Sequence, residues 1–323
     1  MRKRRRGRAR PSLLVAAILV AVVAAAMVLA PRFAGRLAKV APAVAPSTYS
    51  VAVKQDDLPQ GLEAGACVAM RPLQGDRHTT VFVDPGHGGA DPGASGSTSA
   101  GGEVDEKDVT LKVGVALTRR LRQDGYTVVM SRTGDHSVAR IDPSESSDGT
   151  LTPHAIHLDG IARVACANAA QAKVLISIHF NSYADASVGG AETVYGDDRP
   201  FTESSKQLAT SVQSRLLAQF ESRGWQVPDR GITGDSDAGG YALTREGQAY
   251  GHLLELGPAR PGWLDHASAM PGVLVEPLFL SRPSEADVAA DPAEQAAMAA
   301  GLAAGVEQYL APPRTSSPSP VPT

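Results

Sequence analysis

The chain has 323 residues and a net charge of −3. Its length and its ordinary apolar content (43%) are enough for one or two domains. Ten basic residues and no acidic ones lie within the first 39 positions, so the rest of the chain contains 21 basic and 34 acidic residues. An acidic body argues against binding of nucleic acid, which requires a basic face, and two cysteines are too few for a disulfide framework or a cysteine-rich zinc module.

The N-terminal segment predicts export. A basic stretch of residues 1–12 precedes an uncharged apolar run of 18 residues, from Leu13 to Ala30. Signal peptides have apolar cores of about 7–15 residues, whereas a spanning helix needs about 17–25. Residues 1–30 are interpreted as a signal anchor or a signal peptide, and Pro31 directly after the small-residue pattern ending at Ala30 disfavours cleavage and so favours the anchor. Either way the body is expected to be extracytoplasmic, with the membrane contacted through this segment.

The remaining chain divides by composition. Residues 31–78 form an Ala/Pro-rich spacer and lead-in, residues 79–310 a compact domain, and residues 311–323 a Pro/Ser-rich tail that we expect to be disordered. Export would allow a disulfide between Cys67 and Cys166, and two separate buried thiols are the alternative.

Predicted strands and helices alternate along the domain. A helix over 105–125 is indicated by apolar residues four apart (Val109, Val113, Leu117 and Leu121), and further helices are predicted over 158–172, 201–222 and 292–310. Apolar runs predict strands over 79–85, 126–132, 173–180, 191–195 and 273–280. This alternation indicates an α/β fold with a mostly parallel sheet, in which ligands bind at the carboxyl ends of the strands. Residues 133–155 and 224–247 are long polar loops, which are often functional.

Four chemically suited residues lie near these strand ends. His87, His179 and Glu276 fall at the ends of three predicted strands, and Glu106 lies in the first turn of the first helix. Two histidines and one carboxylate form a catalytic zinc set, and a second carboxylate can serve as the base that activates water.

Alternatives remain open at several of these positions. Glu103 competes with Glu106, and Glu255 within "HLLELG" is a rival base for Glu276. Asp84 can orient a ligand histidine or cap a turn. His154 and His157 make a weaker case for a second metal site, and His78, His136, His252 and His266 lack supporting context.

Four segments together carry a family resemblance: "VFVDPGHGGADPGA", "EKDVTLKVGVALTRRL", "ARVACANAAQAKVLISIHFNS" and "MPGVLVEPLFLSRPSEADV". In this order they resemble the zinc-dependent N-acetylmuramoyl-L-alanine amidases of bacterial cell walls. The resemblance implies Zn²⁺ bound by His87, Glu106 and His179, and Glu276 as the catalytic carboxylate in preference to Glu255. It also implies a twisted, mostly parallel sheet flanked by helices on both faces in a single catalytic domain.

The implied activity is hydrolysis of the amide between N-acetylmuramic acid and L-alanine in peptidoglycan, for wall remodelling or daughter-cell separation. A protein activator acting on a regulatory loop is a further expected partner, and nucleic acid is not. A zinc peptidase acting on wall peptides and a non-catalytic wall-binding or activator module are the alternative functions. Pro277 and Leu278 depart from the small residues that the family more often has after the catalytic glutamate.

Overall fold

The computed structural model describes residues 48–312 except residues 59, 148 and 239–243. The predicted signal anchor and the C-terminal tail from residue 313 lie outside the described residues. Among the residues described, no helix is both long enough and apolar enough to cross a membrane.

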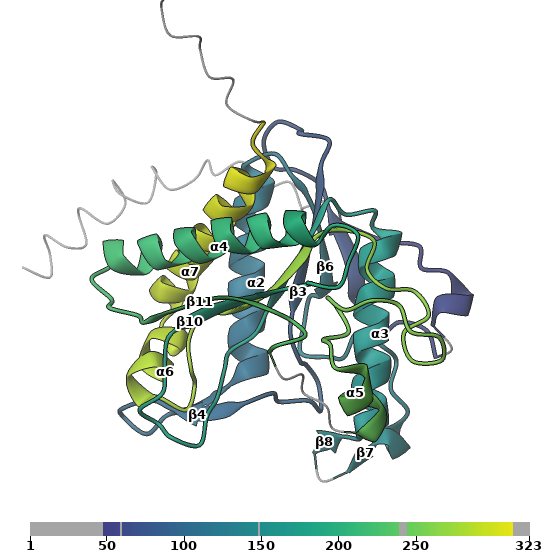
Figure 1. The fold of residues 1–323 in the computed structure, drawn as a ribbon, viewed down its shortest axis with the longest axis horizontal. Coiled ribbons are helices and arrows are strands. Elements are labelled where there is room, and N and C mark those ends of the chain that lie inside the picture. Colours follow the sequence, from purple (N-terminus) through teal and green to yellow (C-terminus); the bar gives the residue numbers. More distant parts are fainter. Residues whose placement is uncertain (1–47, 59, 148, 239–243, 313–323) are drawn as a thin grey trace, which may run out of the picture. The chain divides into compact units, whose positions relative to one another are not determined.

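A mixed, mostly parallel eight-stranded sheet forms the centre of the described unit, in the order β1-β2-β6-β3-β9-β12-β10-β11 (Figure 1). The four central strands β6, β3, β9 and β12 run parallel to one another, as predicted. Antiparallel pairs join β2 to β6, β1 to β2 and β10 to β12, and β11 is parallel to β10. The strands are β1 (Thr48–Ser50), β2 (Ala66–Met70), β3 (Thr80–Pro85), β6 (Thr127–Arg132), β9 (Val174–Ile178), β10 (Ala191–Tyr195), β11 (Asp229–Gly234) and β12 (Gly272–Glu276).

Helices cover both faces of this sheet, which confirms the predicted layers. On one face α2 (Glu106–Gln123), α4 (Thr202–Ser222) and α7 (Pro292–Leu310) pack together over the larger apolar cluster, whereas α3 (Pro153–Ala169) packs on the other face (Figure 1). The predicted stripe on α2 is buried in the larger cluster. The shorter helices are α5 (Arg245–Tyr250) and α6 (Pro283–Ala290).

Several elements had not been predicted. Strands β1 and β2 bring part of the predicted lead-in into the sheet, and β11 lies within the predicted loop 224–247. Helix α3 begins at Pro153 rather than at residue 158, because the Thr152 hydroxyl accepts a hydrogen bond from the Ala155 amide and proline suits the first helical position. Two hairpins, β4 (Ser95–Ser97) with β5 (Glu103–Asp105) and β7 (Ser146–Ser147) with β8 (Thr150–Leu151), lie in the connections.

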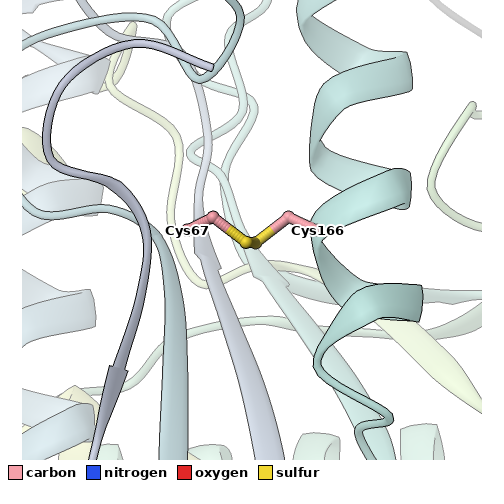
Figure 2. Close-up of a disulfide and its surroundings, with 2 residues drawn as sticks. All are labelled: Cys67 and Cys166. Carbon is pink, nitrogen blue, oxygen red and sulfur yellow. A yellow bond between two sulfur atoms is a disulfide. The ribbon is translucent and has the colours of Figure 1, made fainter. Parts of the chain in front are cut away.

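A disulfide joins β2 to α3. Cys67 and Cys166 are bonded across 99 residues of sequence, with Cα atoms 5.7 Å apart (Figure 2). The first of the two alternatives for these cysteines is therefore the correct one. The bond fixes the antiparallel edge of the sheet to the helix on its second face.

Candidate metal centre and active site

Three side chains that are distant in the sequence bring one donor atom each to a common point. His87 follows β3, Glu106 opens α2 and His179 follows β9. The Nε2 atom of His87, the Oε1 atom of Glu106 and the Nδ1 atom of His179 lie 3.1 Å from one another in all three pairs. The structure therefore brings together the three residues that the sequence indicated as metal ligands.

The spacing of these atoms fits a tetrahedral metal. Zinc bonds of about 2.0–2.1 Å to nitrogen and oxygen place neighbouring ligands of a tetrahedron about 3.3 Å apart. The observed triangle with 3.1 Å sides is close to one face of such a tetrahedron. Two imidazoles and one carboxylate are donor types that suit a metal ion such as zinc.

The main chain around the triangle requires glycine at two positions. A Cβ atom on Gly86 would lie 2.3 Å from the His179 ring, and one on Gly93 would lie 2.5 Å from Glu106 Oε2 and 2.6 Å from the His87 ring. His87 itself has a φ angle of +61°, a left-handed conformation that is uncommon outside glycine. The glycines around His87 thus admit the close approach of these side chains.

Asp91 rather than Asp84 orients the first histidine. The Asp91 carboxylate lies 2.8 Å from His87 Nδ1, so that this nitrogen donates and, when the ring is neutral, Nε2 turns its lone pair toward the triangle. Asp84 instead accepts hydrogen bonds from Arg163 (2.6 Å) and Ser177 (2.9 Å) beneath the site. Neither role proposed for Asp84 from the sequence describes this contact. The sequence feature that could have indicated this role is the position of Asp91, four residues after His87 in the second "DPG".

The carboxylates around the two histidines favour positive charge among the three donor atoms. Burial lowers the pKa of His87, but the Glu106 carboxylate and the hydrogen bond to Asp91 outweigh it and raise this pKa to about 10. Burial likewise opposes ionisation of Glu106, yet the two histidines hold the pKa of this carboxyl well below its usual range. Glu106 is also fixed in place, because Oε1 accepts from the Phe180 amide (2.8 Å) and Oε2 from the Ala94 amide (2.7 Å). A cation between these donors would be stabilised by the same field.

Glu276 lies on the strand next to the one that carries His179. The parallel register pairs Leu274 with Ser177 and Val275 with Ile178, and the His179 amide donates to the Val275 carbonyl (2.9 Å). Continuing this register by one residue pairs Glu276 with His179, which directly follows the neighbouring strand. Because Leu274 and Leu175 share one face of the sheet, the alternation of side chains places Glu276 and His179 on that face too. Glu276 is 3% exposed.

A cavity of about 430 Å³ opens from the triangle. Its walls come from α3, from α5 and from the segment that follows α5, and the rival carboxylate Glu255 lines it together with the three predicted ligands. Burial and the nearby Asp84 raise the pKa of Glu255, although Arg163 opposes this. The far wall is aromatic, since the rings of His157 and Trp263 are stacked at 3.8 Å.

The other candidate residues lie elsewhere. Glu103 is exposed on β5, and His154 approaches Glu145 (3.1 Å) instead of joining a metal set with His157. Among the residues that the structure describes, one further group was missed from the sequence: Asp197, Asp235 and His252, whose ligand atoms lie within 4.8 Å of one another. These residues lie in three separate loops, after β10, β11 and α5, so no local spacing in the sequence indicates the group.

Comparison with known proteins identifies the family of the chain. The model of the Amidase_3 family, N-acetylmuramoyl-L-alanine amidase, matches residues 81–308. A germination-specific N-acetylmuramoyl-L-alanine amidase of Bacillus subtilis is 29% identical over 71% of this chain and 79% of its own length. The N-acetylmuramoyl-L-alanine amidase AmiC2 of Nostoc punctiforme superposes with a TM-score of 0.51 at 25% identity, over 73% of this chain and 99% of its own.

The fold is shared with a further structure, the CwlD amidase of Clostridioides difficile in complex with the GerS lipoprotein. Its TM-score is 0.54 at 23% identity, over 72% of this chain and 98% of that one. Because the family model spans most of the described domain and every segment that supplies a predicted ligand, the chain belongs to the Amidase_3 family of peptidoglycan N-acetylmuramoyl-L-alanine amidases.

Proposed function

We propose that the chain cleaves the amide between the lactyl group of N-acetylmuramic acid and L-alanine with zinc held by His87, Glu106 and His179, and with Glu276 as the catalytic base. The observation that carries this proposal is the triangle of three donor atoms with equal 3.1 Å sides. A zinc ion held there would act as a Lewis acid toward the scissile carbonyl and lower the pKa of a bound water.

The protein side chains then move the proton and hold the geometry. Glu276 takes a proton from the attacking water and returns it to the leaving nitrogen of L-alanine, which departs as an amine. The buried position of Glu276 beside His179 supports this role, because it places the carboxylate next to a residue of the ligand triangle. Asp91 keeps His87 in the tautomer that presents Nε2.

The aromatic end of the cavity is proposed as the place where part of the substrate lies. The stacked His157 and Trp263 offer a flat apolar surface facing the same cavity as the three ligands. The apolar faces of sugar rings and acyl groups pack well against such surfaces. The acidic body gives no general attraction for anionic wall polymers, so binding depends on these local contacts.

The setting proposed for this enzyme is outside the cytoplasm. The disulfide between Cys67 and Cys166 supports an oxidising compartment, since such bonds are rare where thiols are kept reduced. The same proposal includes anchoring in the membrane through residues 1–30 and activation by a protein partner. The lipoprotein bound to the related CwlD amidase supports the proposed protein partner.

A muropeptide digest with two matched variants tests the assignment. Glu276→Gln should keep stoichiometric zinc and lose about 10²–10⁴-fold in turnover, because it removes a general base without touching a ligand. Glu255→Gln, which alters the rival carboxylate in the wall of the cavity, should keep zinc and most of the turnover. His87→Ala should lose both.

The products distinguish the alternatives. An amidase releases intact stem peptides that begin with L-alanine, whereas a wall peptidase leaves L-alanine attached to the sugar. Wild-type turnover by Glu276→Gln, or loss of turnover confined to Glu255→Gln, would transfer the role of base to Glu255. A wild-type protein that binds zinc but releases no peptide would support a binding module.

A further inference from the structure

A fully buried arginine lies directly behind the ligand triangle. Arg132 is the last residue of β6 and is 0% exposed. A cation in this position is costly unless its donors are satisfied, and burial together with the nearby Arg163 lowers the pKa of Arg132 to about 10. The guanidinium therefore depends on the oxygen atoms around it.

Those oxygens belong to the two chain segments that carry ligands. Arg132 Nε donates to the Pro85 carbonyl (3.0 Å), and Nη2 donates to the Gly86 carbonyl (2.9 Å), so both contacts immediately precede His87. The same Nη2 donates to the Lys107 carbonyl (2.7 Å), which immediately follows Glu106. One planar group thus joins the end of β3 to the first turn of α2.

A threonine completes the connection between these segments. The Thr110 hydroxyl on α2 donates to the Gly86 carbonyl (2.9 Å) and accepts from Arg132 Nη2 (3.0 Å). The remaining contact of the guanidinium, from Nη1 to the Gly134 carbonyl (3.0 Å), fixes the loop after β6. Arginine suits this position because its rigid fork can serve several acceptors in one plane, which the single ammonium of lysine cannot.

We infer that Arg132 is a positioning residue of the metal centre: it holds the main chain of His87 and Glu106 at the separation that makes their side chains a ligand pair. The inference rests on the proposed zinc function of these residues. It also accounts for the left-handed backbone of His87, since such conformations persist where the surroundings over-determine them.

The opposite face of the sheet supports the same segment. Arg163 on α3 donates to the Pro85 carbonyl (2.8 Å) and to the His87 carbonyl (2.7 Å), so that the Pro85 oxygen accepts from an arginine on each face. Arg163 is itself held by the carboxylates of Asp84 and Asp159. Arg132 differs, because its hydrogen bonds go to main-chain carbonyls and a hydroxyl, and all but the one to Gly134 lie in the segments that carry His87 and Glu106.

Zinc affinity of the purified chain tests the inference without reference to turnover. Arg132→Lys should bind zinc about 10–100-fold more weakly in competition with a chelating dye, the range found when a group supporting the ligands is lost. Its Co²⁺-substituted form should show a changed visible spectrum, because the ligand angles change. Circular dichroism on the zinc-depleted variant checks that it is folded.

Arg122→Lys is the matched control. Arg122 is also a buried arginine (7% exposed) that donates to a main-chain carbonyl, that of Arg71 (2.7 Å), but it lies in the last turn of α2. This control should lose stability and keep wild-type zinc affinity and Co²⁺ spectrum.

Wild-type affinity and spectrum in a folded Arg132→Lys protein would overturn the inference. If that variant does not fold, Thr110→Val removes the hydroxyl that joins Gly86 to Arg132 at nearly constant volume and should weaken zinc binding roughly three- to tenfold. Unchanged affinity in Thr110→Val would then overturn it. Failure of the zinc function is distinguishable, because the wild-type chain itself would then bind no zinc at this site.

Discussion

The disulfide allows a stability prediction whose size follows from the fold. Cys67 and Cys166 close a loop of 99 residues, and both are fully buried. The chain-entropy model assigns a loop of about 100 residues roughly 4.7 kcal/mol of stabilisation, through the constraint that the bond places on the unfolded chain. Measured values for native disulfides are commonly 2–5 kcal/mol, so we expect the double variant Cys67→Ala, Cys166→Ala to lose about 3–5 kcal/mol.

Equilibrium urea unfolding followed by far-ultraviolet circular dichroism is the assay. With an m value of about 3 kcal/mol/M, the midpoint of the double variant should fall by roughly 1–1.7 M. Wild-type protein unfolded with a thiol reductant should approach the same midpoint, because reduction releases the same loop. A double variant within about 1 kcal/mol of wild type would refute the reasoning, since both the lost constraint and the lost burial act in the same direction.

Three further predictions follow from individual contacts. Gly86→Ala should lower zinc content about 10–100-fold, measured by metal analysis, because its Cβ would lie 2.3 Å from the His179 ring; retained zinc would contradict this. Asp84→Asn should lower the free energy of unfolding by about 2–3 kcal/mol in urea, because it removes one of the two carboxylates that pair with the buried Arg163, and a loss under 1 kcal/mol would show the pair to be dispensable. Burial and the hydrogen bond to the Asp197 carboxyl raise the pKa of Asp235 to about 6, so the contribution of Asp235 to stability is full below about pH 4 and is lost as pH rises through 6. The unfolding free energy of wild type relative to Asp235→Asn should therefore fall between about pH 4 and 7. A difference that stays constant over this range would count against the assignment.

The convergence of His87, Glu106 and His179 could be anticipated from the sequence, because they lie where the chain's periodicity changes. His87 and His179 each follow an apolar run, and Glu106 begins a helix with a clear apolar stripe. In a mostly parallel sheet, the carboxyl ends of neighbouring strands meet at one edge. Strand order could not be obtained in this way, but β3, β9 and β12 are adjacent, and this adjacency brings the residues together.

The elements that escaped prediction depend on partners rather than on their own composition. Strand β11, "DRGITG", contains two glycines and has the composition of a turn, yet it pairs with β10 along its length. Strand β2 becomes part of the sheet by pairing antiparallel with β6. Likewise, the contacts of Arg132 with Pro85 and Lys107 span separations of 47 and 25 residues, so no local pattern revealed them.

The departure of Pro277 from the family motif is compatible with the proposed base. A proline lacks an amide donor, but the neighbouring contacts use other atoms: the Val275 carbonyl accepts from the His179 amide, and the Leu278 carbonyl accepts from the Asn181 amide. Proline also restricts the preceding residue to extended backbone, which is the conformation that Glu276 already has at the end of β12. Because extended backbone keeps Glu276 on the face that carries His179, proline at 277 maintains the geometry that the base requires. We therefore expect the change from a small residue to proline to affect substrate contacts beyond Glu276 rather than the chemistry at the metal.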